Sequence, residues 1–232
     1  LTSLNDAKKI LKEADILKDY NKTRNPSLDI NKFSEEFFTI SRSDDYDYIY
    51  KSAMTKMDYD FLLKDDSFFQ FSCIPREGNI EKGEIRYAFY ENPRDYGTYE
   101  EFLEENGLTY DECQDEFLID YEQEIMEAKL KSNVTPIRYD YNYKLYKPVN
   151  HSISHIHIGH NNEVRVTTAK IISPAKFVSF VLRNIYPDTW NRAFENERFR
   201  EMCFSARRTC KPVNEDYFNE DEKSLLYLTW LF

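Results

Sequence analysis

Two blocks of alternating apolar and polar residues, separated by a long acidic stretch, limit the folds open to this chain. The first block runs from residue 58 to 90, and the second runs from residue 137 to 168. Alternation with a period of two is typical of half-buried strands. Because the strands come in blocks rather than in strict alternation with helices, we predict an α+β fold with an antiparallel sheet of about five to seven strands.

Helical patterns lie before, between and after these blocks. Apolar residues recur at helical spacing, Thr98 begins a capping-box pattern, and Ser173 with Pro174 is a typical helix start. We expect the helices to pack on one face of the sheet and at both termini. The predicted helices cover residues 3–21, 46–57 (a weaker pattern), 98–106, 111–131, 173–185, 187–202 and 220–232, and the last of these ends in a docked apolar tail.

The length and composition predict a globular protein with a substantial core. The chain has 232 residues, of which 41% are hydrophobic and 16% aromatic, values that argue against disorder. We expect one α+β domain over residues 1–232. The alternative is a division into residues 1–131, with the acidic helix, and residues 132–232, with the histidine strand and the C-terminal helices.

The location that we predict is the cytoplasm. No signal peptide is visible, and no apolar run approaches the roughly 20 residues that a membrane span needs. The four cysteines (Cys73, Cys113, Cys203 and Cys210) form no CxxC pair, which favours reduced thiols over a disulfide framework.

The charges are distributed unevenly. The net charge of −11 argues against wholesale coating of nucleic acid. Residues 95–127 contain 13 acids and no Lys or Arg, whereas residues 165–211 contain ten bases and four acids. Both regions can be ordinary solvated surface. The acidic region can alternatively bind a protein partner, and the basic region can bind nucleic acid.

All four histidines lie within ten residues, His151 to His160. The β-branched isoleucines and the closing Gly159 predict a strand that enters a tight turn. Side chains alternate across a strand, so His155 and His157 share one face while Ile156 and Ile158 point to the core.

The preceding strand carries two further candidates, Arg138 and Asp140. If Tyr143 pairs with Ser152, then Asp140 faces His155 and Arg138 faces His157. A register shift of one residue would send both side chains to the opposite face. A carboxylate beside a histidine fixes its tautomer, and Arg donates two hydrogen bonds to a phosphate.

The turn after the histidines determines the place of Arg165. A three-residue turn puts Arg165 beside His157, and a two-residue turn puts it beside Ile158. We favour the first alternative. Lys170, Lys176 and Arg183 are candidates for a positive rim around the site.

Two kinds of chemistry suit these residues, and a structural cluster is the alternative to both. In metal-free cleavage of a phosphodiester, His155 and His157 act as acid and base, Asp140 orients one of them, and Arg138 or Arg165 binds the phosphate. In metal-dependent hydrolysis, a divalent ion such as zinc needs three or four ligands. The candidate ligands are Asp140, His151, His155, His157 and His160. The GxSxG, GxxxxGK[ST], GxGxxG and HExxH motifs are absent.

The second half of the chain resembles a known family. The residues that carry the resemblance are Arg138-Tyr139-Asp140, His151, Ser154 to Gly159, Arg165, Ser173 to Phe177 and Tyr186. They resemble the bacterial family called domain of unknown function 2290, best over residues 136–190. That family label supplies no activity. More distantly, an Arg-Tyr-Asp followed by His-x-His is similar to TumE-type toxins of toxin–antitoxin pairs, which are much shorter and have no counterpart to the first 130 residues.

Two hypotheses follow. The resemblance implies a role in bacterial conflict or phage defence and chemistry on nucleic acid, so the first hypothesis is a nuclease that cleaves phosphodiesters, most readily in RNA, without a metal. The second is a non-enzymatic, protein-binding subunit of a defence or regulatory complex.

Overall fold

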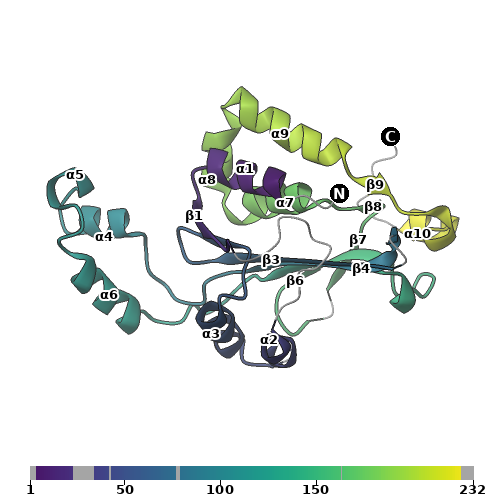
Figure 1. Cartoon of the computed structure of the whole chain (residues 1–232), viewed down its shortest axis with the longest axis horizontal. Helices are drawn as coiled ribbons and strands as arrows, with labels where there is room; N and C mark the ends of the chain where they lie inside the picture. Colours follow the sequence, from purple (N-terminus) through teal and green to yellow (C-terminus); the bar gives the residue numbers. More distant parts are fainter. Residues whose placement is uncertain (1–3, 23–33, 42, 77–78, 163, 226–232) are drawn as a thin grey trace.

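The computed structural model describes residues 4–22, 34–41, 43–76, 79–162 and 164–225, and its centre is a seven-stranded sheet (Figure 1). The strands follow one another in sequence order, and every neighbouring pair is antiparallel. The order is β1 (Leu17–Tyr20), β2 (Phe61–Leu63), β3 (Phe68–Arg76), β4 (Asn79–Tyr90), β5 (Ile137–Asn142), β6 (Ser154–Ile158) and β7 (Arg165–Thr167).

Four helices cover one face of this sheet. They are α1 (Asn5–Glu13), α7 (Pro174–Ile185), α8 (Pro187–Phe194) and α9 (Glu197–Arg208), which lie together above the sheet in Figure 1. The fully buried Phe177 of α7 packs against Phe69, Phe71 and Tyr87 of β3 and β4, with ring centroids 5.8–6.2 Å apart. Burial of these large rings is the main source of stability on this face.

The opposite face is covered over part of its width by α2 (Glu35–Ile40) and α3 (Tyr46–Lys56), below the sheet in Figure 1. A second apolar cluster joins Phe37, Tyr46 and Tyr50 of these helices to Phe68 of β3, and Tyr90 of β4 packs against it. The α+β class and the antiparallel sheet are therefore confirmed. We expected helices on one face of the sheet, but α2 and α3 cover part of the opposite face as well.

The acidic region forms an arm that projects from the sheet, at the left of Figure 1. It consists of α4 (Tyr99–Glu105), α5 (Tyr110–Cys113) and α6 (Leu118–Glu127). The predicted capping box of Thr98 and Glu101 begins α4. At the base of the arm, Asp95 N donates to Lys129 O at 2.9 Å, and Lys131 N donates to Pro93 O at 2.7 Å.

Two predicted helices are shorter than their sequence patterns. The first ends at Glu13, and β1 follows, because Asp15 adopts a left-handed conformation with φ of 53°. The predicted helix over residues 111–131 is broken at Gln114, where φ is 46°. Left-handed backbone ends an α-helix, and in neither place does a glycine mark it in the sequence.

The C-terminal part agrees with the predicted helix starts. Ser173 caps α7 and Pro174 occupies its first turn. β8 (Lys170–Ile171), just before α7, pairs with β9 (Lys211–Pro212), just after α9, in a short two-stranded sheet, and α10 (Glu220–Leu225) follows. The predicted docking of the apolar tail beyond Leu225 lies outside the described residues. None of the helices within the described ranges has the length and apolar character needed to cross a membrane.

Candidate functional site

The register between β5 and β6 places the candidate residues on one face of the sheet. Asp140 pairs with His155 and Arg138 pairs with His157, as predicted from the alternation. The intervening Tyr139 and Ile156 point into the core beneath α7. The polar side chains therefore lie on the face that α2 and α3 cover only in part.

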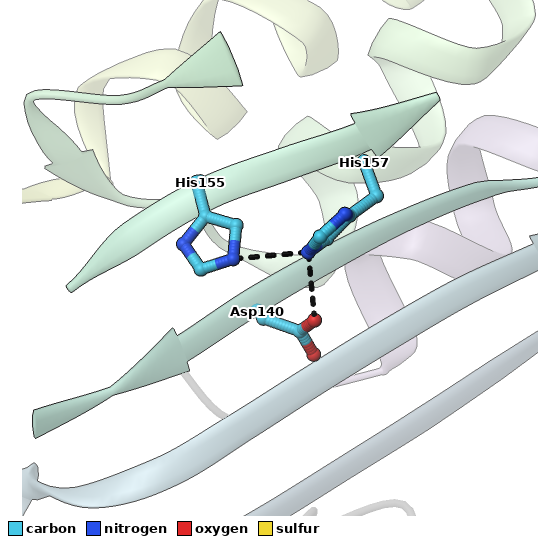
Figure 2. Close-up of side chains that lie close together, drawn as sticks. All are labelled: Asp140, His155 and His157. Atoms are coloured by element: carbon cyan, nitrogen blue, oxygen red, sulfur yellow. Dashed lines mark hydrogen bonds and ion pairs between the residues drawn. The ribbon is translucent and has the colours of Figure 1, made fainter. Parts of the chain in front are cut away.

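Three of these side chains converge on one point. Figure 2 shows Asp140 from β5 and the two imidazoles from β6 turned toward one another. The Nε2 atoms of His155 and His157 are 3.0 Å apart, and Nε2 of His157 lies 3.5 Å from Oδ2 of Asp140. His155 is only 2% exposed, while the side chains of His157 and Asp140 are 12% and 14% exposed. The cluster is thus sheltered, with limited access from solvent.

A backbone contact fixes the tautomer of His155. Its Nδ1 lies 2.8 Å from the carbonyl oxygen of Ser152. Since a carbonyl only accepts, Nδ1 carries the proton, and Nε2 of the neutral ring presents a lone pair to His157. In that state Nε2 of His157 supplies the hydrogen between the two rings.

Burial keeps both imidazoles neutral. Burial, together with the guanidinium of Arg138, lowers the pKa of His157 to about 4. Burial also lowers the pKa of His155, against the opposing effect of Asp140. Neutral imidazoles can accept a proton or ligate a metal ion. Near neutral pH neither ring carries the extra proton that a general acid would donate.

Two guanidiniums hold the carboxylate of Asp140. Nε of Arg86 binds Oδ1 at 3.1 Å, and Nε of Arg138 binds Oδ2 at 2.7 Å. Burial alone would raise the pKa of Asp140, but these two positive charges outweigh it and lower the pKa of the carboxyl. Arg86 and Arg138 are 48% and 45% exposed, so their outer N–H groups face solvent and can meet an anion.

Sequence reasoning missed Arg86. It lies on β4, directly opposite Asp140, 54 residues upstream of it. The available signal was its polar position between Ile85 and Tyr87 in an alternating strand. The polar position of Arg86 indicates a site residue only when β4 is known to pair with β5, and the acidic arm separates these two strands in the sequence.

Arg165 lies opposite His157 on β7, the position that we favoured for it. Positive φ angles at Gly159 (93°) and Asn161 (51°) turn the chain after β6. The exposed Arg165 adds a positive charge close enough to disfavour protonation of His157. The site face therefore carries Arg165 beside the histidines, in addition to the two arginines that hold Asp140.

The outer two histidines lie outside the convergent group. Nε2 of His160 lies 3.2 Å from the carbonyl oxygen of Asp44, and its ring packs on Tyr46, so His160 anchors the β6–β7 turn to the start of α3. The ring of His151 packs edge-on against His155 with centroids 5.0 Å apart, and its Nδ1 is buried with no hydrogen-bond partner among the described residues. Among the described residues, Asp140, His155 and His157 form a group that could hold a metal ion.

The basic region of residues 165–211 does not form one surface around the site. Lys176 and Arg183 belong to α7, which packs on the face of the sheet opposite the histidines. The expected positive rim is supplied by Arg86, Arg138 and Arg165 instead.

A small pocket adjoins the site. It measures about 40 Å³, enough for a water molecule or an ion and too small for a nucleobase. Its lining residues come from α2 and the neighbouring strands and include the two arginines that hold Asp140: Phe37, Ser41, Gln70, Arg86, Ala88, Tyr90 and Arg138. The imidazoles do not line it.

Comparison with known proteins identifies the family. Residues 11–230 match the family described as uncharacterized conserved protein DUF2290. The chain belongs to this family. The DUF2290 match extends far beyond residues 136–190, which carried the resemblance in the sequence. No curated protein and no solved structure matches the chain, and the similarity to TumE-type toxins stays a prediction.

Proposed function

We propose that this protein cleaves phosphodiester bonds in RNA at the site formed by Asp140, His155 and His157, with Arg86, Arg138 and Arg165 binding the phosphate. The observation that carries the proposal is the convergence of two neutral imidazoles and a carboxylate on a face edged by three arginines. As part of it, we propose that the protein acts in the bacterial cytoplasm as a toxin or antiviral defence factor.

The charge arrangement supports a phosphate ligand. In an otherwise acidic chain with a net charge of −11, this face concentrates guanidiniums around a single carboxylate. Guanidinium groups bind phosphate oxygens with paired, charge-assisted hydrogen bonds. They would also stabilise the extra negative charge that develops on phosphorus in the transition state.

The chemistry of RNA supplies the nucleophile within the substrate. The ribose 2′-oxygen attacks phosphorus and gives up its proton to a base of the site. The bond from phosphorus to the 5′-oxygen breaks, and that oxygen takes a proton from water. The products are a 2′,3′-cyclic phosphate and a 5′-hydroxyl. DNA lacks the 2′-hydroxyl, so this reaction is specific for RNA.

The test is cleavage of a labelled single-stranded RNA beside a DNA of the same sequence. We expect only the RNA to be cut, and we expect His157→Ala to reduce the rate by about 100-fold or more, the scale of a lost acid–base group. The matched control is His160→Ala, a histidine of the same run that lies outside the convergent group.

Equal RNA cleavage by wild type and His157→Ala, or no cleavage of any RNA by the wild type, would overturn the proposal. In cells, we expect expression of the wild type to slow growth and expression of His157→Ala not to do so.

A specific feature of the arm favours a second candidate, a protein-binding role. Ile119 and Met126 lie seven residues apart on one face of α6 and are 79% and 74% exposed. They stand within residues 95–127, which contain 13 acids and no bases. An apolar helix face bordered by acids is complementary to a hydrophobic groove bordered by Lys and Arg on a partner.

This second candidate predicts a partner that co-purifies in low salt and dissociates in high salt. The double variant Ile119→Asp with Met126→Asp should lose the partner, while Phe204→Asp, at a 52% exposed position on α9, should keep it. Retention by the double variant would exclude α6 as the binding face. RNA cleavage should be the same in all three proteins.

A further inference from the structure

We infer that Asp140, His155 and His157 form a binding site for one divalent transition-metal ion. The metal site deepens the proposed function, whose chemistry it would serve, but ion binding itself rests on geometry alone. The three ligand atoms are Nε2 of His155, Nε2 of His157 and a carboxylate oxygen of Asp140, and all lie within 4.8 Å of one another.

The separations of these atoms are close to the edges of a coordination polyhedron. Zinc–nitrogen and zinc–oxygen bonds of about 2.0–2.2 Å give ligand–ligand separations of roughly 3.3–3.6 Å in a tetrahedron. The distance from Nε2 of His157 to Oδ2 of Asp140 is 3.5 Å, within this range, and the two Nε2 atoms, 3.0 Å apart, would have to separate slightly around an ion. The third separation, between His155 and the carboxylate, is within 4.8 Å.

The hydrogen bond at Nδ1 of His155 is a second, independent indication of a metal site. Metal-ligating histidines almost always donate their other ring N–H to a backbone carbonyl or a carboxylate, which fixes the tautomer and the ring plane. Nδ1 of His155 has such a contact with Ser152 O at 2.8 Å. The remaining lone pair on Nε2 is therefore directed at the point where the other two ligands converge.

The carboxylate of Asp140 is also held in place by neighbouring side chains. Arg86 and Arg138 hold the two oxygens of Asp140, and Oδ2 still has a second lone pair for an ion. The two guanidiniums oppose a nearby cation, so we expect weaker binding than at a closed structural site. With three protein ligands, coordination positions stay open for water and for a phosphate oxygen.

The same geometry argues against two imidazoles acting as separate acid and base. In an in-line displacement the attacking and leaving oxygens lie on opposite sides of phosphorus. The base and the acid must then face each other across the phosphate, whereas these Nε2 atoms meet at 3.0 Å on one side. Convergent nitrogens suit a shared ion.

A bound ion would supply the base that the proposed reaction needs. Coordination lowers the pKa of water toward neutrality. The resulting hydroxide takes the proton of the 2′-hydroxyl and becomes bound water, while the leaving 5′-oxygen takes a proton from solvent. The arginines then bind the phosphate oxygens on the same face.

The test measures binding of the metal alone. The purified full chain is stripped with a chelator, which is then removed by dialysis, and Zn²⁺ is titrated in by calorimetry while Co²⁺ is followed by its visible absorption. We expect one ion per chain and Co²⁺ bands of low coordination number. We expect His155→Ala and Asp140→Asn to weaken binding at least about tenfold, and His160→Ala to bind as the wild type does.

Folding is checked in the same samples by thermal unfolding. Added Zn²⁺ should raise the melting temperature of the wild type and of His160→Ala but not that of folded His155→Ala. The absence of saturable binding, or equal binding by His155→Ala, would overturn the site.

Parallel cleavage assays separate this inference from the proposed function. Ion binding without RNA cleavage supports the metal site and removes the nuclease. Cleavage that persists in chelator, without ion binding, supports the nuclease and removes the metal site.

Discussion

Arg86 of β4 lies directly opposite Asp140 of β5, and its Nε binds Oδ1 of that carboxylate at 3.1 Å. The arginine is 48% exposed. The side chain of Asp140 is only 14% exposed, so the two residues do not form an ordinary surface ion pair. Arg138 holds the other carboxylate oxygen and remains as a partner when Arg86 is replaced. In the proposed function, the outer N–H groups of Arg86 bind a phosphate oxygen.

Replacing Arg86 should therefore separate activity from stability. We expect Arg86→Gln to lower the free energy of unfolding by no more than about 1.5–3 kcal/mol, because Asp140 keeps Arg138 as a partner. We expect it to reduce RNA cleavage per folded molecule by about tenfold or more, the scale of one lost charge-assisted hydrogen bond. Denaturant titration and initial rates measure the two effects. Arg207→Gln, on the exposed side of α9, is the control and should change neither; an Arg86→Gln protein as active as that control would exclude a role in substrate binding.

Tyr139 lies beneath the site, on the core side of β5, and should affect stability alone. Its hydroxyl lies 2.9 Å from Ser154 Oγ and accepts a hydrogen bond from Ile172 N at 3.1 Å. We expect Tyr139→Phe to cost about 1–3 kcal/mol, because a buried N–H loses its acceptor. Cleavage per folded molecule should stay at the wild-type rate, and a selective loss of cleavage would contradict this division between the two faces.

Phe177 should be among the most costly residues to truncate. It is fully buried between α7 and the sheet, and we expect Phe177→Ala to lower the free energy of unfolding by about 3–5 kcal/mol. Phe204, 52% exposed on α9, is the matched control, and its replacement by Ala should cost no more than about 0.5 kcal/mol. Chemical denaturation of both variants checks the difference, and similar losses would contradict the described packing of α7.

Alkaline pH should weaken the packing of α2 against the sheet. Burial raises the pKa of Tyr90 from 10.0 to about 12, so the folded state keeps this phenol neutral while the unfolded chain ionises it. The stabilisation is complete below pH 10 and is lost as pH rises toward 12. We expect the free energy of unfolding to fall over this interval, and less steeply in Tyr90→Phe. Identical slopes in the two proteins would show that Tyr90 is not the group responsible.

Strand alternation predicts which side chains share a face: Tyr139 and Ile156 on the core side, and Asp140, His155 and His157 on the other. The register itself depended on an assumed pairing of Tyr143 with Ser152, because a shift of two residues buries the same side chains and changes only their partners. The structure pairs Asp140 with His155, as that assumption required. Arg86 could not be predicted in the same way, since its partner strand lies beyond the acidic arm. The helix ends at Asp15 and Gln114 could not be predicted either, because the positive φ angles there fall on residues other than glycine.

The hydrogen bonds at the foot of the acidic arm have a consequence for how this protein can be modified. The arm begins at Asp95 and ends at Lys129, and a backbone hydrogen bond joins these two residues. Excision of the segment between them and its replacement by a short turn would leave the ends of β4 and β5 where they are. The arm is thus a separable module, and its residues can be changed without altering the face of the sheet that carries Asp140, His155 and His157.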